Sequence, residues 1–111
     1  MRGNHLGELE ELVLLSTALL DGNAYTVTIV EEIARQTNRE LTLSSVHTSL
    51  NRLEKKGFVN SYMGGALKER GGRRRRLYKI TSIGYQTLNE AREVRNRMWS
   101  VMPELKFDFT S

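Results

Sequence analysis

The sequence predicts a mainly helical domain that carries one small β-hairpin. Four segments repeat apolar residues at the three- and four-residue spacing of a helix face, two short runs alternate as strands do, and a glycine-rich stretch separates these two runs. The chain has 111 residues, of which 39% are hydrophobic and 27% charged. This is enough for one globular domain with a modest core, and oligomerisation would bury more surface.

The first helix is expected over residues 8–20, where turn-forming Asp21, Gly22 and Asn23 follow the last apolar residue. Its apolar residues lie on two sides, one with Leu9, Leu12, Val13, Leu19 and Leu20 and the other with Leu14, Leu15 and Ala18. A helix that is apolar on two sides needs two partners. One partner can be its own domain and the other a second subunit.

The second helix is expected to begin at Thr26 or Thr28, either of which can cap it, and to fade near Thr37. Thr28 followed by Glu31 fits a capping box, in which each side chain bonds the other residue's backbone N–H group. The inward stripe of this helix is predicted to hold Val27, Val30, Ile33 and Ala34.

The third helix is bounded by Thr42, a good N-cap, and by Gly57, which suits the left-handed position after a helix end. Apolar residues at i, i+4 and i+7, namely Val46, Leu50 and Leu53, predict its buried side. The opposite side is polar and carries Ser44, Thr48, Asn51, Arg52 and Lys55, with His47 on the flank.

A hairpin is expected next, with strands over residues 58–63 and 75–80 and a long polar tip at 64–72. Tyr78 and Ile80 are predicted to point inward. The last helix starts at Thr81. The order helix, helix, helix, hairpin, helix is that of a winged helix-turn-helix domain with an added C-terminal helix. We expect a DNA-binding part over residues 1–80 and a dimerisation helix with a tail over 81–111, joined in one compact unit.

Basic residues concentrate at the hairpin tip. Residues 68–79 hold seven of the 17 basic residues and one of the 13 acidic ones, a local net charge of +6 against +4 for the whole chain. Guanidinium groups match phosphate oxygens in geometry, and several in a row suit a polyanion. Beside a polar helix face that fits the major groove, this charge predicts binding to double-stranded DNA.

The candidate DNA contacts fall into two sets. The recognition helix is expected to contribute small, amide and basic side chains that can read base edges or hold phosphates: Ser44, Ser45, His47, Thr48, Asn51, Arg52 and Lys55. The wing is expected to contribute Lys68, Arg70, Arg73, Arg74 and Arg75. Since a strand alternates its sides, four consecutive arginines cannot all face one duplex, and Arg75 or Arg76 can instead pair within the protein.

A homodimer is expected from the spacing along the last helix, which resembles a seam against another helix. The interface residues predicted on this basis are Leu14, Leu15, Leu88, Ala91, Val94, Met98 and Val101. Such a dimer predicts a pseudo-palindromic operator with half-sites about 34 Å apart.

Three segments resemble the PadR-like family of transcriptional regulators, in particular its short members with a single C-terminal helix. They are residues 7–15 (GELEELVLL), residues 41–46 with 50–59 (LTLSSV and LNRLEKKGFV), and residues 72–84 (GRRRRLYKITSIG). The resemblance covers roughly residues 6–102 and implies a dimeric DNA-binding regulator, a repressor. The chain departs from the family pattern at Thr26-Val27, at Leu43 and at His47-Thr48. The change at His47-Thr48 predicts an operator unlike those of typical members.

The resemblance also implies an effector site, because some members bind planar aromatic compounds between subunits near this helix. Trp99 with Met98 and Met102 could form such a slot here, although a residue of the dimer seam is the simpler interpretation of Trp99.

Other classes of function have little support in the sequence. There is no cysteine, no apolar run long enough to span a membrane and no signal peptide, which favours a cytoplasmic protein. We see no catalytic constellation, metal-ligand spacing or cofactor motif, so an enzyme is not expected. Two alternatives stay open: another kind of winged-helix regulator, and a winged-helix module that binds an acidic protein partner.

Overall fold

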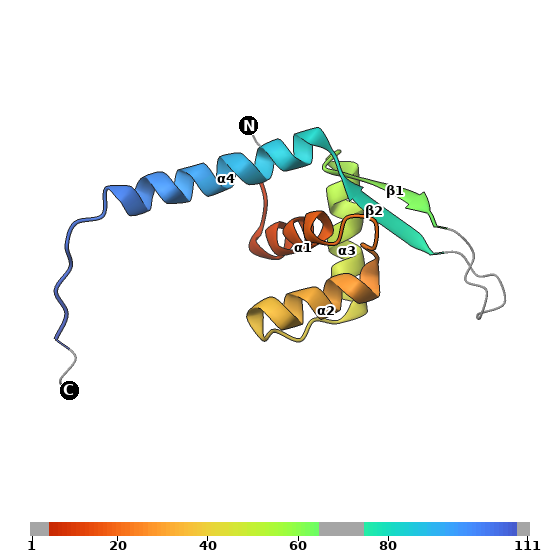
Figure 1. The fold of residues 1–111 in the computed structure, drawn as a ribbon, viewed down its shortest axis with the longest axis horizontal. Helices are drawn as coiled ribbons and strands as arrows, with labels where there is room; N and C mark the ends of the chain where they lie inside the picture. Colours follow the sequence, from red (N-terminus) through yellow and green to blue (C-terminus); the bar gives the residue numbers. More distant parts are fainter. Residues whose placement is uncertain (1–4, 65–74, 109–111) are drawn as a thin grey trace.

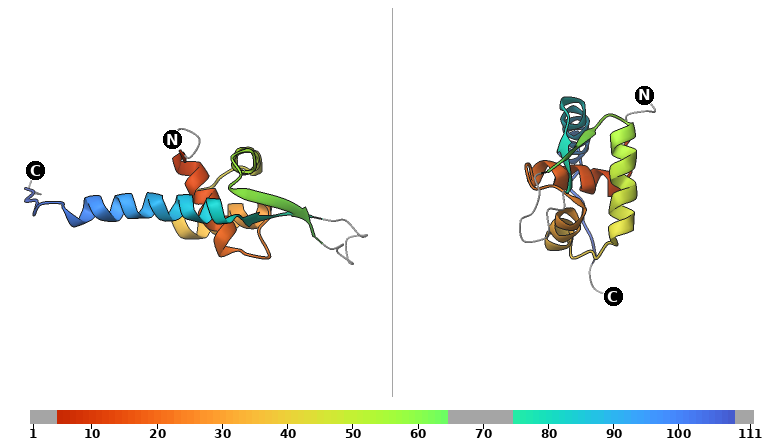
Figure 2. Two further views of the ribbon diagram at one scale, coloured as in Figure 1. Left: turned by 90° about the horizontal axis from the view of Figure 1, so that it is seen from above. Right: turned by 90° about the vertical axis from the view of Figure 1, so that its right-hand side faces the viewer.

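The structure, a computed structural model, describes residues 5–64 and 75–108. Three helices, α1 (Glu8–Leu19), α2 (Thr26–Thr37) and α3 (Leu43–Lys55), form a body from which an antiparallel hairpin of β1 (Val59–Met63) and β2 (Arg76–Ile80) extends (Figure 1). Helix α4 (Ser82–Ser100) starts at the hairpin base and runs the opposite way, as Figure 1 and the left view of Figure 2 show. The mainly helical class and the order of elements are confirmed.

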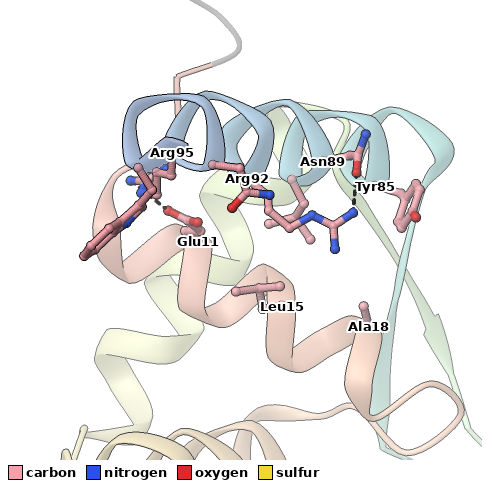
Figure 3. Close-up of a pocket in the computed structure, with 10 residues that line it drawn as sticks. Glu11, Leu15, Ala18, Tyr85, Asn89, Arg92 and Arg95 are labelled. Atoms are coloured by element: carbon pink, nitrogen blue, oxygen red, sulfur yellow. Dashed lines mark hydrogen bonds and ion pairs between the residues drawn. The ribbon is translucent and has the colours of Figure 1, made fainter. Parts of the chain in front are cut away.

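Helix α4 changes its surroundings along its length. Its first half lies along α1, where Gly84, Thr87 and Leu88 are buried (Figure 3). From Arg92 to Ser100 every residue is exposed. The last turns of α4 therefore extend beyond the body of the protomer.

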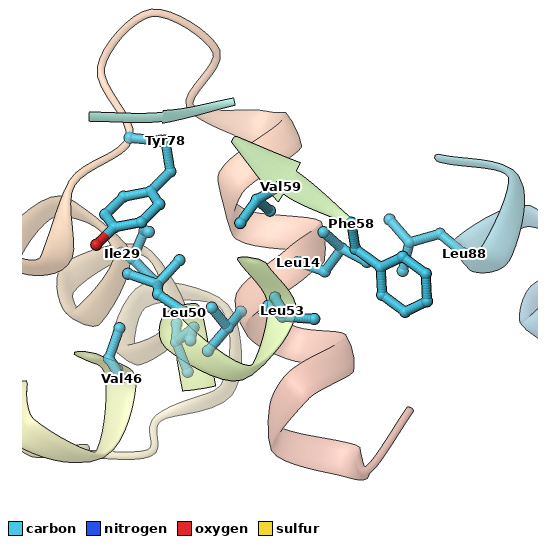
Figure 4. Packing of buried hydrophobic residues seen from close by; sticks show 12 residues of the cluster. Leu14, Ile29, Val46, Leu50, Leu53, Phe58, Val59, Tyr78 and Leu88 are labelled. Carbon is cyan, nitrogen blue, oxygen red and sulfur yellow. The ribbon is translucent and has the colours of Figure 1, made fainter. Parts of the chain in front are cut away.

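The core lies where the three body helices meet the base of the hairpin (Figure 4). The predicted buried residues of α3, Val46, Leu50 and Leu53, are all completely buried. Phe58 lies between the body and Leu88 of α4, and Tyr78 of β2 points inward as predicted. The full cluster also includes Val13, Leu14, Ala24, Ile29, Ile33 and Val59.

The bounds of α3 are set by local hydrogen bonds, as predicted. At the start, the Thr42 hydroxyl accepts from the Ser45 N–H group at 3.1 Å. At the end, Gly57 has a φ of 82°, its N–H group donates to the Glu54 carbonyl at 3.0 Å, and the Phe58 N–H group donates to the Leu53 carbonyl at 2.9 Å. This pair of bonds is a Schellman motif, which stops the helix and turns the chain into β1.

The start of α2 differs from the prediction. The helix begins at Thr26 with Tyr25 as its N-cap residue, and Thr28 lies inside its first turn. The Thr28 hydroxyl accepts from the Tyr25 N–H group at 3.0 Å and donates to the Asn23 carbonyl at 2.7 Å, so the predicted capping box with Glu31 does not form. Two residues turn a helix by about 200°, so the buried Ile29 directs Val27 outward, where it is 41% exposed.

Tyr78 and Thr81 join the hairpin to the rest of the body. The Tyr78 N–H group donates to the Ala24 carbonyl at 2.8 Å, which attaches the outer edge of β2 to the turn between α1 and α2. Thr81 caps α4 by accepting from the Gly84 N–H group at 3.0 Å, and its hydroxyl donates to the Gly57 carbonyl at 2.7 Å. A Cβ atom on Gly84 would lie 2.3 Å from the Phe58 carbonyl oxygen, so glycine permits this close approach of α4 to the start of β1.

Candidate nucleic-acid interface

Helix α3 lies along one side of the body (Figure 2), and its outer face is polar. Because Val46, Leu50 and Leu53 hold the opposite face in the core, the helix cannot turn these polar residues inward. The exposed residues of this face are Ser44, His47, Thr48, Asn51, Arg52 and Lys55. All of them were predicted as DNA contacts. The structure brings them together on one helix beside the base of the hairpin.

These side chains differ in whether they already make hydrogen bonds within the protein. The Ser45 hydroxyl donates to the Thr42 carbonyl at 2.9 Å, and the Ser44 hydroxyl lies 3.3 Å from the Thr42 hydroxyl, so both serines take part in the helix start. The other five side chains of this face make no hydrogen bond or ion pair with any described residue. They are those of His47, Thr48, Asn51, Arg52 and Lys55. Those five are available to a ligand.

Lys56 has a structural role, unlike its neighbour Lys55. Its Nζ atom lies 2.7 Å from Glu10 Oε1 and 2.8 Å from the His5 carbonyl, which ties the end of α3 to the start of α1. Burial would raise the pKa of Glu10, but the hydrogen bonds from Lys56 and from the Gly7 N–H group outweigh burial and lower that pKa. The ion pair thus fixes the orientation of α3 against the body.

The wing is described only at its base. Lys68, Arg70, Arg73 and Arg74, predicted as DNA contacts, lie outside the described residues. Arg75, the fifth predicted wing contact, places its guanidinium carbon 4.3 Å from the centre of the Tyr25 ring.

Arg76 contacts the protein on the other side of β2. Its Nη1 atom donates to the Ser61 hydroxyl at 2.9 Å, and Ser61 donates to Glu54 Oε2 at 2.8 Å. No role was predicted for Tyr25, Glu54 or Ser61. Strand alternation could have placed Ser61 and Arg76 on one face, but no local pattern pointed to Tyr25.

A groove of about 410 Å³ lies between α1 and α4 and is lined by residues from both halves of α4 (Figure 3). The ion pair between Arg95 and Glu11, 3.5 Å apart, crosses it, and Arg92 donates to the Asn89 side-chain oxygen at 2.6 Å. Its apolar lining includes Leu15, Ala18, Tyr85 and Trp99. Trp99 is 70% exposed, so one face of the groove stands open in the protomer.

The residues predicted for a dimer interface divide into two groups. Leu14 is fully buried and Leu88 nearly so, and both belong to the protomer's own core, so their assignment to an interface between subunits is wrong. The helical spacing that suggested them is the same for a core contact and a subunit contact. The remaining predicted residues are half-buried (Ala91) or exposed (Leu15, Val94, Met98 and Val101).

Among the described residues, no helix is long and apolar enough to cross a membrane. In the same part of the chain, no three histidine or acidic side chains gather in a way that could hold a metal ion.

Comparison with known proteins identifies a family to which the chain is similar along most of its length. The model of the transcriptional regulator PadR-like family matches residues 14–90. No curated protein matches the chain significantly. Solved structures similar to it include a transcriptional regulator from Clostridium thermocellum, with 24% identity, 84% of each chain covered and a TM-score of 0.64. A PadR family transcription regulator from Clostridium difficile R20291 has 24% identity and a TM-score of 0.67, with 86% of this chain and 95% of that chain covered.

A third similar structure is that of Bacillus subtilis PadR in complex with operator DNA. It has 15% identity and a TM-score of 0.59, and the match covers 93% of this chain and 53% of the other. At these identities the three structures support the fold. Together they confirm the winged-helix class predicted from the order of elements.

Proposed function

This chain belongs to the PadR-like family of transcriptional regulators, and from that premise we propose that it binds operator DNA as a homodimer and represses transcription. The observation that carries the proposal is the outer face of α3, where His47, Thr48, Asn51, Arg52 and Lys55 are exposed and make no side-chain hydrogen bond or ion pair within the described chain. A surface of unengaged donors and acceptors on a rigid helix is what base reading requires.

In the proposed complex α3 enters the major groove, which is about 12 Å wide and admits a helix. Ser44, Ser45, His47 and Thr48 lie in the N-terminal half of α3, the part that helix-turn-helix proteins direct at bases. Asn51 can bond adenine through two hydrogen bonds, whereas Arg52 and Lys55 reach guanine or phosphate. Because the hydroxyl of Ser45 is engaged in the helix start, the five later residues, His47, Thr48, Asn51, Arg52 and Lys55, carry most of the proposed specificity.

The wing is proposed to hold phosphates through Lys68, Arg70, Arg73 and Arg74. Arg73→Ala combined with Arg74→Ala should weaken binding to all sequences alike. It should also flatten the dependence of log affinity on log salt concentration by about 0.9 for each lost phosphate contact. Titrations of labelled duplex at several salt concentrations measure both quantities. An unchanged affinity and an unchanged slope would exclude the wing from DNA binding.

The proposed dimer joins α4 of each protomer to α1 and α4 of its partner. The support is the exposed half of α4, where Val94, Met98 and Val101 are 45%, 66% and 76% exposed. Apolar side chains repeated along an exposed helix face are typical of an interface. Light scattering after size exclusion tests the dimer, and a strict monomer at micromolar concentration would contradict it.

A planar aromatic effector is proposed for the groove between α1 and α4. Trp99 and Tyr85 supply aromatic surfaces there, and Met98 and Met102 are adaptable neighbours of Trp99. Trp99 is the only tryptophan, so its fluorescence reports directly on this site. A panel of flat cationic compounds should quench it; no change with any member would remove the effector from the proposal.

One experiment separates DNA binding from the alternative, a module that binds an acidic protein. A mobility-shift assay with the chain's own upstream region, in the presence of heparin as competitor, should show a complex that survives heparin. A complex that heparin removes entirely would indicate charge-driven binding alone, as expected of an acidic-partner module. Increased expression from that upstream region in a reporter strain lacking the protein would support repression.

A further inference from the structure

We propose that Arg75 and Arg76 position the wing and do not contact DNA. In this proposal the two arginines clamp the hairpin base to the body from opposite sides and thereby fix the hairpin tip relative to α3. The inference rests on the DNA-binding role proposed above. It assigns Tyr25, Glu54 and Ser61, which do not face DNA in that proposal, a role in holding the two DNA-contacting elements in register.

The first clamp joins the hairpin to α3 itself. Glu54 on α3 accepts a hydrogen bond from Ser61 on β1, and Ser61 accepts one from Arg76 on β2, at 2.8 and 2.9 Å. In the strand register Ser61 pairs with Tyr78 and Arg76 with Met63, so Ser61 and Arg76 are diagonal neighbours on one face of the hairpin. The positive Arg76 and the negative Glu54 thus share one hydroxyl, and all three elements are linked by side chains.

The second clamp joins the other side of the hairpin to the start of α2. The Arg75 guanidinium lies over the Tyr25 ring, with 4.3 Å from the guanidinium carbon to the ring centre, a distance typical of a cation–π contact. Tyr25 is the N-cap residue of α2, and the adjacent Ala24 carbonyl accepts from the Tyr78 N–H group at 2.8 Å. The backbone of Tyr78 and the side chain of Arg75 therefore hold β2 and the residue before it against the body.

The two contacts explain why consecutive arginines do not serve as a pair on DNA. Successive residues of a strand point to opposite faces, and Arg75 and Arg76 follow this rule, one toward Tyr25 and the other toward Ser61. Each guanidinium already has a partner in the protein. Hence a move to a phosphate would exchange one favourable contact for another and would free the hairpin to pivot at its base.

A fixed wing matters because the proposed interface has two parts. Phosphate contacts from the tip set the register in which α3 reads bases, and they do so only if the distance between tip and helix is constant. A hairpin free to pivot would keep its phosphate contacts but lose the alignment with α3. Loss of a clamp should therefore lower affinity without changing the number of phosphates contacted.

The test compares clamp variants with a phosphate-contact variant. Ser61→Ala, Arg76→Gln and Tyr25→Leu should each weaken operator binding by about 3- to 10-fold with an unchanged salt slope, because no phosphate contact is lost. Ser61→Thr keeps the hydroxyl and should retain wild-type affinity. The double variant Ser61→Ala with Arg76→Gln should bind no more weakly than Ser61→Ala alone, since Ser61→Ala already removes the hydrogen bonds to both Arg76 and Glu54. The Arg73→Ala, Arg74→Ala pair is the control that must flatten the slope.

A second measurement does not depend on DNA. Amide hydrogen exchange of residues 59–63 and 76–80 should be faster in Ser61→Ala and Tyr25→Leu than in the wild type, while exchange in α3 should not change. A wild type that binds no DNA would overturn the proposed function, and unchanged exchange in the variants would overturn the clamp. An Arg76→Gln variant with a salt slope lower by about 0.9, beside a Ser61→Ala variant with normal affinity, would show that Arg76 contacts phosphate instead.

Discussion

The body of the protomer and the exposed half of α4 are built from similar sequence patterns but have different surroundings. In the body, Val46, Leu50 and Leu53 at helical spacing are completely buried, and among the described residues no buried side-chain nitrogen or oxygen atom lacks a hydrogen-bond partner. In α4 beyond Ala91, the same spacing leaves Val94, Met98 and Val101 exposed. The contrast fits the proposed dimer, in which a second protomer would cover the exposed end of α4.

The two regions meet at the start of α4. Leu88 completes the core of the body and Trp99 borders the open groove, although both lie on the same helix. Changes on either side of this point should therefore have separable effects. Mutations beyond Ala91 should alter assembly, and mutations before it should alter stability.

The largest effect is expected from Val94→Glu combined with Met98→Glu. Burying two carboxylates in the proposed interface should weaken the dimer by about 3 kcal/mol or more, which raises its dissociation constant over 100-fold. Sedimentation or light scattering over a dilution series measures this constant. Gln86→Glu adds a charge to the exposed surface of the first half of α4 and should leave the dimer intact.

The melting temperature of the monomeric double variant should stay close to that of the wild type at low concentration, because its body is unchanged. If the double variant instead unfolds, the exposed half of α4 contributes to the body and the contrast between the two regions fails.

The next effect is expected from Gly84→Ala, at the joint between the two regions. The new Cβ atom would lie 2.3 Å from the Phe58 carbonyl oxygen and 3.0 Å from a side-chain carbon of Ile80. The resulting displacement of α4 should cost about 2 kcal/mol of unfolding free energy and lower the melting temperature by about 10 °C. Gly7→Ala is the control: a Cβ atom there would meet nothing within 4 Å, so only the weaker N-cap preference of alanine is lost and the melting temperature should fall much less.

A smaller effect, confined to the body, is expected from Glu10→Gln. The variant loses the charge that pairs with Lys56 and should cost about 1–2 kcal/mol of unfolding free energy at neutral pH. Because the pKa of Glu10 is lowered in the folded chain, its contribution is complete above about pH 5 and is lost as the pH falls through the folded pKa. Urea unfolding between pH 3 and pH 7 should therefore show a flatter pH dependence for Glu10→Gln than for the wild type. Equal slopes would contradict this role of the ion pair.

Sequence patterns alone predicted the order of the elements and which sides of α3 are buried and exposed. Val46, Leu50 and Leu53 define a single buried face, and Thr42 and Gly57 mark the helix ends with strong local signals. Such features depend on residues close together in the chain, which is why sequence patterns predict them well.

Features that depend on distant residues were not predictable. Leu88 and Val94 belong to the same helical repeat of apolar residues. Leu88 is a core residue because Phe58, which is distant in the sequence, packs in the same cluster. The Tyr25 N-cap of α2 is stabilised by a hydroxyl three residues later rather than by a typical capping residue. The Glu54, Ser61 and Arg76 contacts join three elements, so no local pattern could reveal them.

The junction between β2 and α4 has a mechanical consequence. Thr81 alone separates Ile80, the last residue of the strand, from Ser82, the first of the helix, and its backbone and hydroxyl are bonded to Phe58 and Gly57. One residue offers only two soft dihedral angles, and the hydrogen bonds of Thr81 hold them in place, so the angle between β2 and α4 is set by the segment that ends α3. A partner bound to the far end of α4 would therefore meet a hairpin whose direction is already determined.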